Sequence, residues 1–178
     1  VAMRLLSGGS LGDRISYRLE NKMPMPGLPE ISRILSQAAS ALDYAHERGV
    51  IHRDIKPNNI MFDQHGGAYI VDFGIAKLVG TTSSIKGSTF LGTPSFMAPE
   101  QWEGQPPTPA VDQYALAAVV YMMITGRAPF EAEIALALMK KHLSETPPDI
   151  REYRSDAPES LNEILLRAMA KQPADRFP

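Results

Sequence analysis

The stretch His52-Arg53-Asp54-Ile55-Lys56-Pro57-Asn58-Asn59 is a polar loop between segments of two different patterns. In the segment before it, 28–48, apolar residues recur with helical spacing and form one stripe, and Gly49 follows in the position of a C-terminal cap. After it, residues 60–63 and 68–71 have the pattern of two short strands joined by a tight connection. These patterns predict a fold that is mainly α with a small β ribbon.

Helical patterns also dominate the second half of the chain. Thr108 and Pro109 predict a helix start, with a capping hydroxyl and a proline at the first helical position. The helix that follows, Ala110 to Thr125, is apolar nearly all round, so we expect it to be buried in the centre of the fold, and Gly126 ends it. Further helices are expected near residues 131–143 and 158–171, and connections at residues 5–11 and 72–99.

The composition is that of a folded domain and excludes several kinds of protein. Hydrophobic residues make up 44% of the 178, which argues against disorder. The formal net charge of −2 gives no reason to expect a nucleic acid or an acidic membrane surface as a partner. The sequence contains no cysteine, which excludes disulfides and thiolate metal sites, and its longest apolar run, Ala115 to Ile124, is too short to span a bilayer.

Two shorter motifs follow the polar loop. Asp72-Phe73-Gly74 comes directly after the predicted strands, and Ala98-Pro99-Glu100 comes later. Each tripeptide alone is a weak signal, but together with the loop they form an ordered set that resembles the signature of protein kinases. Residues 92–101 and 123–130 are similar to those of bacterial-type serine/threonine kinases.

The resemblance implies a protein-kinase-like C-terminal lobe (α+β). Residues 1–178 would form a partial protein kinase domain, made of the hinge and this lobe, with an activation segment at 72–100. The N-terminal lobe is absent from the sequence, which has no Gly-rich loop, no strand Lys and no helix Glu, and we interpret both ends as cuts. We therefore expect this chain alone to bind ATP poorly and to show little turnover.

The resemblance also assigns catalytic roles, with ATP and Mg²⁺ as the expected cofactors. Asp54 would accept the proton of the substrate hydroxyl, and Lys56 would contact the γ-phosphate and mark serine/threonine specificity. Asn59 and Asp72 would hold Mg²⁺, a hard cation that prefers oxygen ligands. Thr93 would bond to Asp54 and Lys56 and help to shape the substrate groove; the alternative is that it is an ordinary turn residue.

The start of the chain resembles the kinase hinge. Met3 falls at the gatekeeper position, and backbone groups of Arg4 and Leu6 would bond to the edge of the adenine. Ser10 would lie near the ribose, and Met61 would form the apolar floor under the adenine. Without the resemblance, these first residues also fit a flexible Gly-Ser linker.

Control is expected in the activation segment. Kinases of this type are switched by phosphorylation there, and Thr89 is the first candidate acceptor. The added negative charge would pair with Arg53 and Lys77 and order the segment. The alternative is that Thr89 is a solvated loop hydroxyl. Weaker candidate acceptors are Ser88, Ser84, Thr82 and Thr81.

A second group of residues is expected to be structural. The resemblance implies a buried ion pair between Glu100 and Arg176, and the loss of one partner would leave an unpaired buried charge. Asp112 would hold the backbone of the catalytic loop. His52 is expected to be a packing residue under Phe73 and not a base.

The leading hypothesis for function is transfer of the γ-phosphate of ATP to Ser/Thr hydroxyls of proteins. We expect autophosphorylation through self-association, no nucleic-acid partner and a cytoplasmic location, with any membrane tether outside these residues. One alternative is a pseudokinase that acts as a binding scaffold, which the intact Asp54, Asn59 and Asp72 disfavour. Another is a small-molecule kinase, which the full activation segment disfavours, because that segment builds a groove for an extended peptide.

Overall fold

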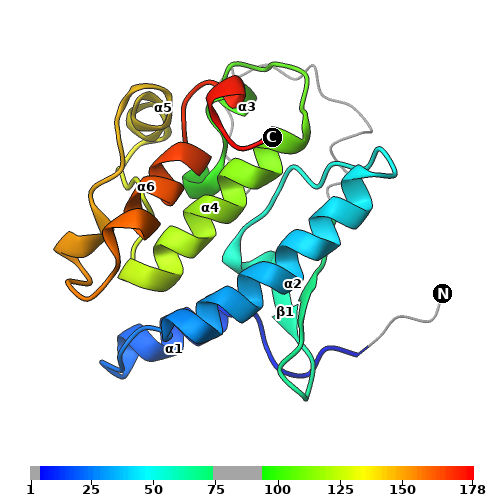
Figure 1. Ribbon diagram of the computed structural model, residues 1–178, viewed down its shortest axis with the longest axis vertical. Coiled ribbons are helices and arrows are strands. Elements are labelled where there is room, and N and C mark those ends of the chain that lie inside the picture. Colours follow the sequence, from blue (N-terminus) through cyan, green and yellow to red (C-terminus); the bar gives the residue numbers. More distant parts are fainter. Residues whose placement is uncertain (1–4, 74–93) are drawn as a thin grey trace.

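The computed structural model describes residues 5–73 and 94–178. Helices predominate, and the one sheet among the described residues is a two-stranded antiparallel ribbon. Figure 1 shows α4 inside the helical layer, with α6 and α5 on one side and α2 with the ribbon on the other. The helices and strands are α1 (Leu11–Glu20), α2 (Leu28–His46), β1 (Ile60–Phe62), β2 (Ala68–Ile70), α3 (Pro99–Trp102), α4 (Pro109–Thr125), α5 (Ala135–Ser144) and α6 (Glu159–Ala168).

The helix before the polar loop lies within two residues of its predicted bounds. Its apolar stripe is buried, with Ile31, Ile34, Ala38 and Leu42 all less than 5% exposed. Gly49 follows with φ +73°, the left-handed conformation that glycine adopts without steric cost. The stripe packs α2 against α4 and against β2.

The central helix α4 confirms the prediction of a buried, all-apolar helix. It begins at Pro109 and ends before Gly126, which adopts the left-handed conformation at φ 76°. The expected capping hydroxyl is wrong: Thr108 occupies the N-cap position, but its side chain makes no capping hydrogen bond. One charged residue, Asp112, is fully buried in the first turn of this helix.

The β ribbon follows the polar loop directly. Ile60 pairs with Ile70 and Phe62 with Ala68, and the turn is closed by Asp63, whose Oδ1 accepts from the backbone N–H groups of His65 and Gly67 at 2.9 Å each. The strands are one residue shorter at their C-terminal ends than the pattern predicted. The ribbon therefore fixes where the polar loop ends and where Asp72 begins.

Helix α1 was not expected: residues 5–11 were interpreted as a connection, and no helix was predicted for the residues that follow them. Ser10 caps it in a capping box with Asp13, and Leu11 and Ile15 form its buried face. Gly12 obscured the helical pattern, although it has a structural reason: a Cβ at this position would overlap Asn58 Oδ1. The glycine thus allows α1 to pack closely on η1 (Pro57–Asn59), which belongs to the polar loop.

The last two helices are shorter than predicted, because α5 begins at Ala135 and α6 ends at Ala168. Among the described residues, no helix has the length and apolar character needed to cross a membrane.

Candidate active site

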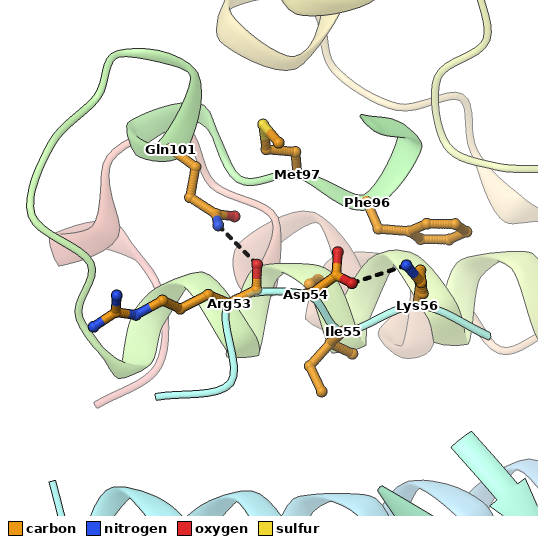
Figure 2. Close-up of a pocket in the computed structure, with 8 residues that line it drawn as sticks. Arg53, Asp54, Ile55, Lys56, Phe96, Met97 and Gln101 are labelled. Atoms are coloured by element: carbon orange, nitrogen blue, oxygen red, sulfur yellow. Dashed lines mark hydrogen bonds and ion pairs between the residues drawn. The ribbon is translucent and has the colours of Figure 1, made fainter. Parts of the chain in front are cut away.

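Three side chains of the polar loop converge. Lys56 Nζ lies 2.8 Å from Asp54 Oδ2, and Asn59 Nδ2 donates to the Asp54 backbone carbonyl at 2.8 Å and to Asp54 Oδ2 at 3.3 Å. Figure 2 shows the Lys56 side chain directed at the Asp54 carboxylate. Because the amide nitrogen of Asn59 faces Asp54, its amide oxygen remains available as a ligand for a cation.

A carboxylate in the first turn of α4 accepts hydrogen bonds from the backbone of this loop. Asp112 is 0% exposed, and its two carboxylate oxygens accept from the N–H groups of His52 and Arg53, each at 2.8 Å. Arg53 has φ 68°, a strained value for a residue with a side chain, so these bonds stabilise an unfavourable backbone conformation. Asp112 therefore has the contacts expected from the sequence.

Two further residues support the loop, and sequence reasoning missed both. His46 Nε2 at the end of α2 lies 2.8 Å from Asp112 Oδ2. Gln101 Nε2 on α3 donates to the Arg53 carbonyl at 3.1 Å, as Figure 2 shows. Neither contact leaves a local sequence signal, because each partner lies 48 or more positions away along the chain.

The residues around Asp72 are tied to the same loop through His52. His52 is 0% exposed and lies 2.9 Å from the Val71 carbonyl through Nε2, while its Nδ1 accepts from the Asp54 N–H at 3.2 Å. Its ring centroid lies 4.7 Å from that of Phe73, which is the packing expected from the sequence. Both ring nitrogens of His52 are therefore engaged in contacts with the backbone of the two loops.

Asp72 lies next to this network. The N–H of Val71, its neighbour, donates to the backbone carbonyl of Asn59 at 3.0 Å, so the two predicted magnesium ligands belong to adjoining segments. Asp72 is exposed and has φ 57°, which is rare for a residue other than glycine and is typical of functional sites. The arrangement places Asp72 at the surface beside Asn59.

On the predicted nucleotide side, Ser10 and Met61 lie together. An isolated antiparallel bridge joins their backbones, and Leu6 is half-buried in the segment leading to them. The Ser10 hydroxyl is already engaged: it donates to Asp13 Oδ2 at 2.7 Å and accepts from the Asp13 N–H at 3.0 Å. The Ser10 backbone N–H, which donates to Asp13 Oδ2 at 2.9 Å, and next the Ser10 hydroxyl lower the pKa of the Asp13 carboxyl. The hydroxyl also makes Ser10 a helix cap.

Several predicted residues lie outside the described residues. They are Met3, Arg4, Lys77, Thr81, Thr82, Ser84, Ser88, Thr89 and Thr93.

The expected ion pair between Glu100 and Arg176 is present. Arg176 donates to both carboxylate oxygens of Glu100, at 2.7 and 2.8 Å, and both side chains are almost completely buried. Arg176 also donates to the backbone carbonyls of Ala110 and Ala170 at 2.8 Å each. This charge-assisted cluster joins α3, the start of α4 and the end of the chain.

A small cavity of about 20 Å³ opens beside Asp54. Its walls include Lys56 of the loop, Phe96 of η3 (Pro94–Phe96) and Met97, and Figure 2 shows Phe96 and Met97 on the side opposite the loop. Gln101 and Arg53 close one end of the cavity.

Comparison with known proteins identifies the family. The family of the protein kinase domain matches residues 1–178. This chain belongs to the protein kinase family. It is 37% identical over 148 residues to the serine/threonine-protein kinase PrkC of Bacillus subtilis, and 38% identical over 175 residues to the serine/threonine-protein kinase PknH of Mycobacterium tuberculosis. These matches cover 83% and 98% of this chain, and 23% and 27% of the two relatives.

The kinase chain thus spans about a quarter of the length of the curated relatives it matches. The match confirms the bacterial-type serine/threonine kinase resemblance and the fold class expected from the sequence. It also gives the convergent side chains of the polar loop a chemical context, since protein kinases use ATP and a divalent metal ion.

The residues of this kinase chain fit a magnesium nucleotide. Mg²⁺ binds through one or two protein oxygens together with phosphate oxygens and water, and Asn59 Oδ1 and the Asp72 carboxylate would supply such a pair. Within residues 5–73 and 94–178, no cluster of three or more His, Cys, Asp or Glu side chains could hold a metal ion.

Proposed function

We propose that the parent protein transfers the γ-phosphate of ATP to Ser or Thr hydroxyls of proteins. One observation carries the proposal: Asp54, Lys56 and Asn59 converge within hydrogen-bonding distance on a loop whose strained backbone is held by a buried carboxylate. Phosphoryl transfer requires alignment and charge neutralisation more than covalent chemistry, and this arrangement supplies both.

Each of these residues has one task in the proposed reaction. Asp54 orients the attacking hydroxyl and takes its proton. Lys56 adds a positive charge beside the transferred group, and its 2.8 Å contact with Asp54 keeps that charge at the reacting centre. Asn59 and Asp72 hold the metal ion. Bound Mg²⁺-ATP supplies the phosphoryl group and neutralises the charge on its oxygens.

The nucleotide would occupy the edge formed by Leu6, Ser10 and Met61, with Arg4 preceding them. Half-buried Leu6 and Met61 give this edge its apolar character. Since the Ser10 hydroxyl is engaged in the helix cap, Ser10 contributes to nucleotide binding through the position of its backbone beside Met61. Thr93 is assigned to the substrate groove by its place in the motif.

Regulation by phosphorylation is supported by Arg53. Its Nε is buried and has no hydrogen-bond partner among the described residues, so a donor is available for an added anion. We propose phosphorylated Thr89 as that anion, with Lys77 as a second contact, and self-association as the route to autophosphorylation. Thr89→Ala in the intact kinase should remove activation by preincubation with ATP. Full activation of that variant would contradict the assignment.

The proposal places catalysis in the intact protein and not in this chain alone. The cytoplasmic location, and a membrane tether outside these residues, are part of the same proposal. Mixing the purified 178-residue chain with Mg²⁺-ATP and a protein substrate should give turnover at least about a hundredfold below that of the intact kinase, because the missing groups orient the phosphates.

The decisive experiment changes Asp54 in the intact kinase. Asp54→Asn keeps the size of the side chain and removes the proton acceptor, so kcat should fall by about 10²- to 10⁴-fold while the KM for ATP changes little. Asp156→Asn is the matched control, because Asp156 is exposed and contacts Arg154 at the surface. If the Asp54 variant transferred phosphate as fast as the unmodified kinase, the proposal would be overturned. If the unmodified kinase transferred no phosphate, a binding scaffold would be favoured.

A further inference from the structure

The side-chain amide of Gln101 bonds to two segments that lie far apart in the sequence. Its Nε2 donates to the Arg53 carbonyl at 3.1 Å, which Figure 2 shows, and its Oε1 accepts from the Ala98 N–H at 3.1 Å. A flipped amide would set a donor against a donor and an acceptor against an acceptor, so this orientation is the one that fits. One side chain therefore joins the polar loop to the segment that leads into α3.

The bond to Ala98 does not by itself require glutamine. Ala98 occupies the N-cap position of α3, and Gln101 lies three residues later, where a capping box places Glu or Gln. A glutamate would accept from the Ala98 N–H equally well, because that bond needs only an acceptor. The bond to the Arg53 carbonyl needs a donor, which an ionised glutamate lacks. The contact with the polar loop thus explains why the residue at this position is glutamine.

The contacted carbonyl belongs to the peptide unit directly before Asp54. The N–H of the same unit donates to His52 Nδ1 at 3.2 Å. Because Arg53 has φ 68°, this unit follows a strained residue and needs contacts to hold its plane. Asp112 holds the preceding peptide unit through the Arg53 N–H, so the carbonyl side of the unit before Asp54 depends on Gln101. Rotation of that unit would change the direction in which the Asp54 side chain leaves the loop.

The second bond of Gln101 reaches the opposite side of the cavity beside Asp54. Phe96 and Met97, directly before Ala98, line that cavity on the side facing the loop (Figure 2). Ala98 is 0% exposed, so its N–H is bonded where no water competes. Gln101 also lines the cavity, and its amide connects the two sides.

We propose that Gln101 is a positioning residue, which fixes the peptide unit before Asp54 relative to the wall formed by Phe96 and Met97. Gln101 does not touch the reacting atoms and acts through the Arg53 carbonyl. The inference rests on the proposed function, because it takes Asp54 to be the group that accepts the proton of the substrate hydroxyl.

Two substitutions in the intact kinase separate the two bonds of the amide. Gln101→Glu keeps the acceptor for Ala98 and replaces the donor with a second oxygen, which repels the Arg53 carbonyl. Its kcat should fall about five- to tenfold, the effect of one net hydrogen bond, with the KM for ATP within about twofold. Gln101→Lys keeps a donor for Arg53 and leaves the buried Ala98 N–H without an acceptor, so it should lower Tm more than Gln101→Glu does and retain most of kcat.

A second measurement does not depend on turnover. Hydrogen exchange at the Asp54 amide, which belongs to the same peptide unit as the Arg53 carbonyl, should be faster in Gln101→Glu and close to the unmodified rate in Gln101→Lys. Gln105→Glu is the matched control, because Gln105 is exposed and contacts Glu103 at the surface. This change should alter neither kcat nor the exchange rate at Asp54.

The outcomes separate the inference from the function on which it rests. If Gln101→Glu kept both the original kcat and the original exchange rate at Asp54, or if the Glu and Lys variants lost kcat equally, the positioning role of Gln101 would be overturned. If the unmodified kinase transfers no phosphate, the proposed function fails, and the exchange rates at Asp54 still decide whether Gln101 fixes this peptide unit.

Discussion

At the scale of single residues, Asp112 holds the catalytic loop in a conformation that the loop would not keep alone. Arg53 has φ 68°, and a left-handed residue with a side chain costs on the order of 1–3 kcal/mol. Asp112 offsets this cost with 2.8 Å bonds to the N–H groups of His52 and Arg53, made where no water competes.

Asp112→Ala should therefore disrupt both stability and catalysis. It leaves two N–H groups without an acceptor, and we expect the free energy of unfolding to fall by roughly 2–6 kcal/mol, because each buried unpaired donor costs about 1–3 kcal/mol. Chemical denaturation and a phosphotransfer assay of the intact kinase would measure the two effects. Asp43→Asn, on the exposed face of α2, is the control, and an Asp112→Ala variant with unchanged kcat would contradict this role.

The structure brings together residues that the motif singled out, and their catalytic roles stay predictions. Asp54, Lys56 and Asn59 were predicted because they lie within one loop, and the structure brings them together. His46 and Gln101 were missed because their partners are distant along the chain and a hydrogen bond to a backbone carbonyl needs no particular sequence spacing. Local sequence therefore identifies the motif residues of the loop more readily than the distant residues that hold the loop in place.

At the scale of elements, α1 shows why a helix escaped the sequence pattern. Glycine in a helix interior is less favourable than alanine by about 1 kcal/mol, and Gly12 weakened the helical signal between Ser10 and Ile15. Glycine is required at position 12 because this residue lies against Asn58, and a side chain there would overlap the polar-loop segment η1. Tertiary packing thus overrides propensity at this position.

Gly12→Ala tests that explanation through the sign of its effect. If propensity decided, the variant would be more stable by about 1 kcal/mol. Because the added Cβ meets Asn58 Oδ1, we expect instead a loss of about 1–3 kcal/mol in the free energy of unfolding, the usual cost of overpacking. Ser16→Ala is the control, because Ser16 is exposed on the same helix, and this change should be neutral or slightly stabilising. A Gly12→Ala variant more stable than the unmodified protein would show that the contact between α1 and Asn58 does not require glycine.

At the scale of the whole molecule, the buried ion pair between Glu100 and Arg176 joins segments that lie 76 positions apart in the sequence. Glu100 lies in the first turn of α3, the helix that supports Arg53 through Gln101. Arg176 also donates to the backbone carbonyls of Ala110 and Ala170. Both partners were predicted from motif resemblance, whereas the buried carbonyls that complete the guanidinium contacts were not predictable from residue types.

Removal of one charge from this pair should be costly. Glu100→Gln leaves a buried guanidinium without its counter-charge, and we expect a loss of about 3–5 kcal/mol in the free energy of unfolding. The double variant Glu100→Leu with Arg176→Met should recover a large part of that loss, because it leaves no unpaired charge. Asp156→Asn, which breaks an exposed ion pair, should cost less than about 1 kcal/mol. A double variant less stable than Glu100→Gln would contradict this account.

The buried ring of His142 makes the stability of the whole fold depend on pH. Burial lowers the pKa of His142 from 6.5 to about 4, so the unfolded chain takes up a proton at a pH where the folded chain does not. The contribution of His142 to stability is therefore fully present above pH 6.5, is lost progressively as the pH falls, and reaches a limit below about pH 4, where both states are protonated.

His142→Gln removes this titration and keeps a polar side chain in the same place. The unmodified kinase should lose up to about 3 kcal/mol more than the variant between pH 7 and 4, since about 1.4 kcal/mol accompanies each tenfold change in proton affinity. Urea denaturation at a series of pH values gives the difference curve directly, and carboxylates common to both proteins cancel in it. Parallel curves for the two proteins would mean that His142 titrates alike in the folded and unfolded states, which its position among Tyr114, Trp102 and Phe130 does not allow.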